Sequence, residues 1–273
     1  MKKLFLTAAL ASIVAFAGAQ TLTTKAGNPI LPEDGDWSIS FDASPLGTIF
    51  RDSGPSALSS SFLDSWTIVG KMMTSSNTAF RAKLRIGSHS HKQDGFSDQT
   101  GSTTTPAATV TDTKKESSMN ITLGGGIQKY RGKGRVQGYY GAEAMIMLGS
   151  GKTTYDYGNA ITSAAPSPDR TDFGTNISFP GVYTTEDKSG SSFGFGVRGF
   201  IGAEYFFAEK MSFGFEYGWG PSISSTGEGE ATAEYYDATT SGPKTSSGKT
   251  GGSSDFLIDI DNASGMVAFS LYF

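Results

Sequence analysis

The sequence closes with "GMVAFSLYF" (Gly265–Phe273), in which apolar residues occupy every second position. A β-strand directs alternate side chains to opposite faces, so Val267, Phe269 and Leu271 share one face with the terminal Phe273. Chain ends usually fray into water unless they are tied down. The stretch therefore predicts a last strand that is held in a sheet and meets an apolar environment.

The same alternation predicts eight strands along the chain, and no segment has convincing helical periodicity. The eighth strand changes phase, because Phe256 and Ile258 are out of step with Val267. A one-residue bulge within 261–265 restores one apolar face. The expected strands are residues 37–50, 62–73, 79–87, 118–130, 135–148, 191–207, 211–220 and 256–273.

The connections between these strands alternate strictly between short and long. Tight turns are expected at "TSSN" (74–77), "RGKG" (131–134) and "AEK" (208–210). The others are rich in Ser, Thr, Gly, Asp and Pro. Such long loops are uncommon inside compact soluble domains, whereas outer-membrane barrels combine short periplasmic turns with long outward loops. The long loops are expected near 51–61, 91–117, 150–189 and 222–254.

The first residues, "MKKLFLTAALASIVAFAGAQ", have the three parts of a secretory signal peptide: Lys2 and Lys3, an apolar run, and a small-residue cleavage site at 17–19. We therefore expect residues 1–19 to be removed and residues 20–273 to form the mature domain. The chain has no cysteine, so packing and hydrogen bonds hold the fold. Without Lys2 and Lys3, 20 basic and 26 acidic side chains give a net charge of −6, which disfavours nucleic-acid binding.

Together, the signal peptide, the eight alternating strands, the alternating turn lengths and the terminal Phe273 resemble the small outer-membrane barrels of the OmpA/OmpX type. The resemblance implies an all-β, eight-stranded, antiparallel, up-and-down transmembrane β-barrel in the bacterial outer membrane. It also implies that Val267, Phe269, Leu271 and Phe273 are the signal read by the outer-membrane assembly machinery. No peptidoglycan-binding domain follows, so tethering to the cell wall is not expected. A soluble periplasmic β-protein is the alternative at the level of fold.

In such a barrel every backbone group is paired, lipid-facing positions are apolar and lumen-facing positions are polar. The charged residues of the polar faces are therefore expected inside, where they must pair because an unpaired buried charge costs several kcal/mol. We predict an ion-pair network that fills the lumen, in preference to a network that exchanges partners to open a pore. Its members are Arg81, Lys83, Arg85, Glu143, Arg198, Glu204 and Glu216.

Aromatic residues near the strand ends are expected to form the two girdles at the membrane interfaces. These residues are Tyr130, Tyr139, Tyr205, Phe207, Trp219 and Tyr272.

His89 and His91, in "GSHSHKQDG", are the two histidines of the chain. Some small outer-membrane barrels modify lipid A with His and Ser or Asp at the outer rim, and histidines at positions i and i+2 share a strand face where a metal could bridge them. Solvated side chains beside a polar loop are the favoured interpretation. We accordingly expect no catalytic residue, metal or cofactor.

The sequence favours a structural or surface-interaction role, of the adhesion or defence kind. A narrow gated channel for small solutes and a lipid A-modifying enzyme are the alternatives. The expected partners are outer-membrane lipid, lipopolysaccharide and the assembly machinery, together with an extracellular partner that the sequence does not identify.

Overall fold

A computed structural model describes residues 22–42, 66–132, 134–174, 181–260 and 266–273. Within these ranges the regular structure is all β, and no helix is long and apolar enough to cross a membrane. The strands are β1 (Trp37–Asp42), β2 (Trp66–Ser75), β3 (Thr78–Asp98), β4 (Thr109–Arg131), β5 (Val136–Asp156), β6 (Val182–Lys188), β7 (Ser192–Ala208), β8 (Met211–Thr226), β9 (Gly229–Asp237), β10 (Gly242–Thr250), β11 (Ser253–Ile260) and β12 (Met266–Tyr272).

Strand pairing closes into a ring. In the described part of the chain, antiparallel ladders join β1 to β2, β2 to β3, β3 to β4, β4 to β5, β5 to β7, β7 to β8, and β8 to β12. β12 then pairs with β1 through five residue pairs, from Ser38↔Tyr272 to Asp42↔Ala268. The predicted eight-stranded, antiparallel, up-and-down barrel is therefore confirmed. The final strand is tied down because it closes the ring.

The other four elements prolong strands of the ring. β11 pairs with β8 up to Ser253↔Thr226, and β10 continues this ladder with β9 from Thr250↔Gly229, three residues further along each strand. β6 lies in the same way beyond the start of β7 and pairs with β5 and β9. Beyond the barrel, the sheet continues in the order β10-β9-β6-β5-β4-β3. We call this six-stranded part the extension.

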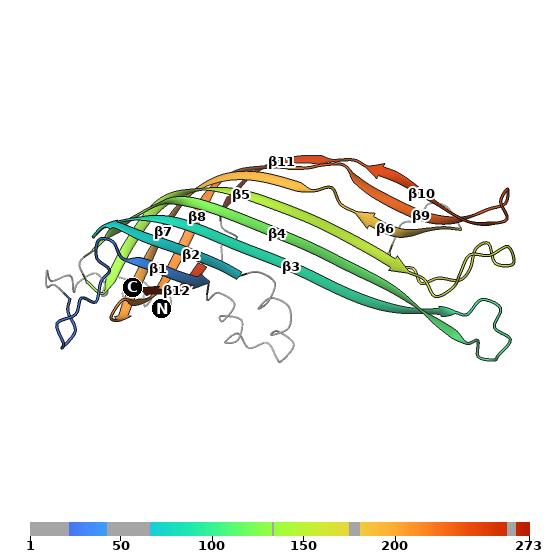
Figure 1. The fold of residues 1–273 in the computed structure, drawn as a ribbon, viewed down its shortest axis with the longest axis horizontal. Coiled ribbons are helices and arrows are strands. Elements are labelled where there is room, and N and C mark those ends of the chain that lie inside the picture. The colour runs from blue at the N-terminus through green and yellow to red at the C-terminus, as the bar shows by residue number, and fades with distance from the viewer. Residues whose placement is uncertain (1–21, 43–65, 133, 175–180, 261–265) are drawn as a thin grey trace, which may run out of the picture.

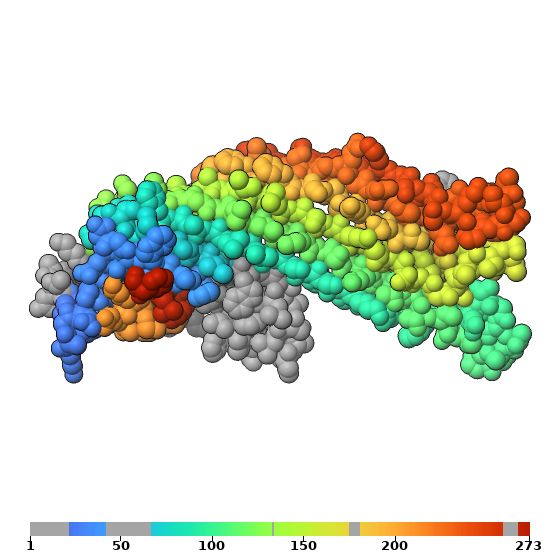
Figure 2. Space-filling view, viewed as in Figure 1, coloured from blue at the N-terminus to red at the C-terminus, as the bar shows by residue number. Residues whose placement is uncertain are grey.

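The extension makes the molecule long and curved (Figure 1). The short turns lie at the barrel end together with β1 and β12, whereas the β3–β4 and β9–β10 tips lie far from it. Figure 2 shows the same outline in space-filling form, with the two tips at the end opposite the C-terminal strand.

Much of the expected loop sequence is strand. Residues 91–98 belong to β3 and 109–117 to β4, which leaves 99–108 as their connection. Residues 222–254 are mostly β8, β9, β10 and the start of β11. The expectation of long loops was wrong there because these strands are polar: β10 is almost wholly exposed, and the residues buried beneath the 157–174 segment include Ser97 and Asp112, so no apolar alternation marks them in the sequence. The loop near 51–61 and the signal peptide at 1–19 lie outside the described residues.

The outer surface of the ring is apolar and the inner surface is polar. Large apolar side chains that are exposed around the ring include Trp37, Ile39, Ile68, Phe80, Ile86, Leu123, Ile127, Ile146, Phe195, Ile201, Phe213, Phe215 and Val267. We call this surface the apolar band. Buried residues include Lys71, Arg81, Glu143, Glu204 and Glu216. This arrangement is the inverse of a soluble sheet protein and is typical of a barrel that spans a membrane.

The phase change in the eighth strand is also resolved by pairing. Phe256 lies opposite Ile223 and Val267 lies opposite Phe215, and these two β8 residues are separated by an even number of positions. The two parts of the strand therefore present their apolar residues on the same outer face. The predicted bulge itself, within 261–265, lies outside the described residues.

Candidate functional site

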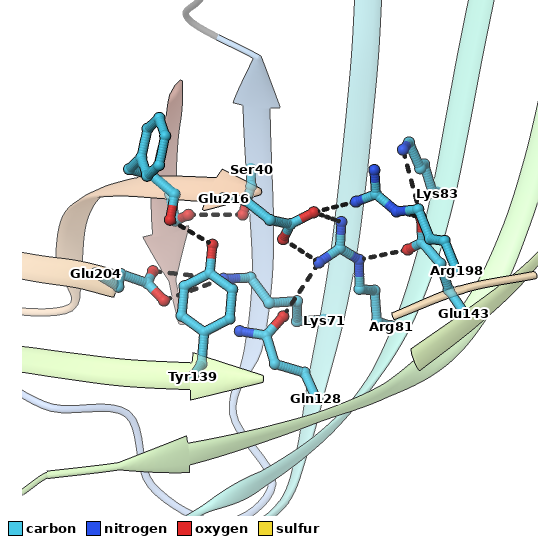
Figure 3. Close-up of polar contacts among 12 residues, drawn as sticks. Ser40, Lys71, Arg81, Lys83, Gln128, Tyr139, Glu143, Arg198, Glu204 and Glu216 are labelled. Atoms are coloured by element: carbon cyan, nitrogen blue, oxygen red, sulfur yellow. Dashed lines mark hydrogen bonds and ion pairs between the residues drawn. The ribbon is translucent and has the colours of Figure 1, made fainter. Parts of the chain in front are cut away.

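The interior of the barrel holds two groups of buried polar side chains, each held together by ion pairs or hydrogen bonds (Figure 3). Strand alternation places them there, since each contributing strand directs every second residue inward. The first group is a closed ring of ion pairs made by Arg81 of β3, Glu143 of β5, Arg198 of β7 and Glu216 of β8. We call it the arginine–glutamate ring.

In this ring each glutamate contacts both arginines. Glu143 lies 2.9 Å from Nε of Arg81 and 2.8 Å from Nε of Arg198. Glu216 accepts hydrogen bonds from Nη1 and Nη2 of Arg81, at 2.5 and 2.9 Å, and from Nη2 of Arg198. Because every carboxylate is shared, removal of one partner leaves a buried charge uncompensated, which is the costly case for buried ion pairs.

Neighbouring side chains complete the packing around the ring. Nζ of Lys83 lies 3.4 Å from Glu143, and the guanidinium of Arg81 lies 4.3 Å from the centre of the Phe200 ring. Gly220, on β8, approaches β7 so closely that a Cβ atom there would lie 2.0 Å from the carbonyl oxygen of Val197. Glycine is therefore required at this position for the wall to close around Arg198.

The second group lies nearer the short turns, and we call it the lysine–tyrosine cluster. Lys71 of β2 donates to Tyr272 at 2.9 Å and to Glu204 at 3.3 Å. Tyr272 in turn donates to Glu204 at 2.9 Å, and its hydroxyl lies 2.9 Å from that of Tyr130. Ser212 also donates to Glu204. Glu204 thus accepts hydrogen bonds from the neutral hydroxyls of Tyr272 and Ser212 and from one cation, Lys71.

The segment before β1 covers the turn end of the barrel. Ile30 is 1% exposed and packs in an apolar cluster with Met73, Ala79 and Phe206. The backbone N–H of Lys210, in the β7–β8 turn, donates to the Ile30 carbonyl at 3.0 Å, and Nζ of Lys210 pairs with Asp36 at 2.8 Å. This segment therefore adds an apolar layer beneath the lysine–tyrosine cluster.

Little space remains between these layers. A cavity of about 10 Å³ lies among Lys71, Arg81, Glu204 and Glu216. One water molecule needs at least about this volume, so the interior is filled at this level. On the outer side of the arginine–glutamate ring the lumen widens into a cavity of about 850 Å³.

The structure brings most of the predicted network together. Arg81, Lys83, Glu143, Arg198 and Glu216 lie in or beside the arginine–glutamate ring. The other two members lie elsewhere: Glu204 belongs to the lysine–tyrosine cluster, and Arg85 is exposed and lines the larger cavity.

His89 lines the larger cavity at the outer rim of the barrel and His91 follows it on β3; they lie opposite Ser118 and Glu116, and their ring centres are 6.4 Å apart. In the described residues, no group of three or more His, Cys, Asp or Glu side chains is placed to hold a metal ion.

Several interior residues were missed from the sequence. Lys71 shares the inward face of β2 with Val69 and Met73 and is out of phase with the exposed Ile68, so its position in the alternation could have identified it as an interior residue. Tyr130, Tyr139 and Tyr272 were expected in the interfacial girdles, and this was wrong because they point inward and are buried. Tyr205, Phe207 and Trp219 are exposed, as residues of a girdle would be.

The four residues of the expected assembly signal share one face of the terminal strand. Val267 and Leu271, of β12, and the final Phe273 are exposed. Phe269 packs against Phe207 and Phe213, with ring centres 6.2 and 5.3 Å away.

Of the comparisons with known proteins, the one with solved structures gives a match. No family model matches the sequence, and no curated protein matches it. Among solved structures, the chain is similar to the outer membrane protein OprG from Pseudomonas aeruginosa. The sequence identity is 14%, the match covers 89% of this chain and 98% of that one, and the TM-score is 0.36.

Proposed function

We propose that the protein is an integral outer-membrane β-barrel with a surface-interaction role, in which a closed barrel anchors an extension that meets partners outside the cell. The observation that carries the proposal is the contrast between the two halves of the molecule. The barrel is filled by the arginine–glutamate ring, the lysine–tyrosine cluster and the Ile30 layer. The extension, in contrast, is an open sheet with polar strands and a large accessible surface.

Physical chemistry supports the anchoring part of this proposal. A closed barrel satisfies its backbone hydrogen bonds internally, which hydrocarbon requires, and the apolar band supplies a lipid-facing surface. Outer-membrane lipid and lipopolysaccharide are the proposed surroundings of the band. Export through the signal peptide at 1–19, and insertion directed by the terminal strand residues Val267, Phe269, Leu271 and Phe273, complete the proposed route to the membrane.

A filled interior favours anchoring over transport. Two arginines and two glutamates joined in one ring must break several ion pairs together before a pore opens. Buried pairs of this kind cost about 3–5 kcal/mol when one partner is removed. The proposal therefore assigns the protein no channel function.

The test is a variant that lacks the extension but keeps the barrel. Short turns would replace residues 90–116, 152–188 and 229–250, so that each hairpin ends near the outer rim. Bacteria that display the full chain should attach to host cells or to other bacteria, and bacteria that display the shortened chain should not. Both chains should show the heat-dependent gel mobility of a closed barrel. Equal attachment by the two chains would refute the proposed role of the extension.

A further inference from the structure

The extension contains a cleft where β5 and β6 separate. Their ladder has three residue pairs and ends at Thr154↔Glu186, although β5 continues to Asp156 and β6 begins at Val182. A cavity of about 520 Å³ opens between them, a size that suits a small ligand. We call it the tip cleft. It is lined by Thr154, Tyr155, Asp156, Tyr157, Arg170, Thr185, Glu186, Thr232 and Glu234.

One wall of the tip cleft is held rigidly by Arg170. Its side chain is 2% exposed, and its guanidinium lies 4.5 Å from the Tyr157 ring centre and 4.4 Å from that of Tyr183. It donates to the carbonyl of Asn159 at 2.7 Å and pairs with Glu234 at 3.3 Å. The guanidinium of Arg170 already has its aromatic, carbonyl and carboxylate partners, so its role is to hold the side chains of this wall in place.

The aromatic side chains form a continuous platform. The rings of Tyr155 and Tyr157 are nearly parallel, at 9°, with centres 6.4 Å apart, and Phe173 packs 6.1 Å from Tyr155. The Tyr157 hydroxyl donates to the Thr184 carbonyl at 3.0 Å, which fixes that ring in place. The platform is therefore prepared before any ligand arrives, and a prepared site loses less entropy on binding.

The polar groups of the tip cleft mostly accept hydrogen bonds. Its lining has three carboxylates, Asp156, Glu186 and Glu234, and one cation, Arg170, which gives a net charge of −2. Lys152 pairs with Glu186 from outside the lining, at 2.9 Å. Carboxylates accept and cannot donate, so they require a ligand that carries donors, and an anionic ligand would be repelled. The faces of aromatic rings are negative and favour electropositive C–H groups.

These properties describe a saccharide. A sugar ring has a C–H face that can lie on an aromatic platform, and its edge is a row of hydroxyl donors. Threonine hydroxyls at positions 154, 185 and 232 offer further neutral partners, which a simple hydrophobic cation would not use. We propose that the tip cleft binds a neutral sugar residue of an extracellular glycan, with its C–H face on Tyr155 and its hydroxyls on Glu234 and the threonine side chains of the lining. This inference rests on the proposed surface-interaction role and names the chemistry of the partner.

The test uses the full chain in detergent micelles on an array of neutral, amino, sialylated and phosphorylated glycans, followed by calorimetric titration of the best neutral sugar. Glu234→Gln replaces a carboxylate acceptor of the lining by an amide of the same size and should weaken binding at least fivefold. Tyr155→Leu keeps apolar volume but removes the ring, and should weaken binding at least tenfold. Glu230→Gln is the matched control: Glu230 is exposed on β9 of the same sheet but does not line the cleft, so binding should be unchanged.

Three results would overturn the proposal: no neutral sugar binds, anionic glycans bind better than neutral ones, or Glu234→Gln and Tyr155→Leu bind as well as the parent chain. The attachment assay separates this failure from failure of the proposed function. If the full chain attaches, the shortened chain does not, and Tyr155→Leu attaches normally, the extension has a role but the tip cleft is not its glycan site. If both chains attach equally, the proposed function itself fails.

Discussion

Glu216→Gln is the substitution that most directly probes the arginine–glutamate ring. It preserves the size of the side chain but removes the carboxylate that contacts Arg81 at 2.5 and 2.9 Å and also contacts Arg198. Both arginines would then depend on Glu143, which also faces Lys83. A buried charge that loses its partner costs about 3–5 kcal/mol. We expect a loss near the lower limit, about 3 kcal/mol, because Glu143 remains; this corresponds to more than about a hundredfold in the folding equilibrium.

The assay is urea unfolding of the chain folded in phospholipid vesicles, followed by tryptophan fluorescence. Glu228→Gln is the control, since Glu228 pairs with Lys249 at 2.7 Å but both side chains are more than half exposed, so at most about 1 kcal/mol should be lost. The double variant Arg198→Gln/Glu216→Gln removes one charge of each sign. It should be more stable than the sum of the single effects indicates, by about 1–3 kcal/mol. A Glu216→Gln loss as small as that of Glu228→Gln, or strict additivity, would refute the role given to the ring.

Three further outcomes are expected. Tyr272→Phe removes the hydroxyl that donates to Glu204 at 2.9 Å and should lower the unfolding free energy by about 1–3 kcal/mol in the same urea titration. Ile30→Asp should raise hydrogen exchange of residues 22–36 by at least tenfold, because it places a charge in an apolar cluster; unchanged exchange would contradict the turn-end layer. Asp112 accepts from the backbone N–H groups of Thr171 and Gly158, and although burial acts to raise its pKa, these bonds hold the pKa below its usual range. Because this pKa is lowered in the folded state, the stabilisation is present above the unfolded pKa of about 3.9 and is lost as the pH falls through the folded value. Hydrogen-exchange protection of residues 157–174 should therefore be constant from about pH 8 to 5 and should fall below about pH 4.

The barrel could be predicted from the sequence because the membrane imposes a pattern on it. Outward positions must be apolar and inward positions polar, so the alternation around Arg81, Glu143 and Arg198 identified both the strands and most of the interior charges. The turns could be found because short connections carry distinctive residues.

The strands of the extension and the buried tyrosines of the interior could not be predicted from the sequence in the same way. Strands such as β10, whose residues are nearly all exposed, alternate between two solvated faces and so resemble loops in sequence. The sequence pattern does not place Tyr130 and Tyr272, because tyrosine suits both an interfacial girdle and a hydrogen-bonded interior. Their inward position depends on Lys71 and Glu204, which lie at the same level of the barrel and supply hydrogen-bond partners. The role of Ile30 depends on how the chain folds back across the turn end, which no local pattern specifies.

The most direct test of the filled barrel is the electrical conductance of the full chain in a planar lipid bilayer, with insertion checked by its heat-dependent gel mobility. The layers around Arg81, Glu204 and Ile30 leave about 10 Å³ of space at the level of the ion pairs. We expect inserted protein to show no discrete current steps across the voltage range that the bilayer tolerates. Regular single-channel steps from the same preparation would contradict a filled interior and would favour the gated-channel alternative.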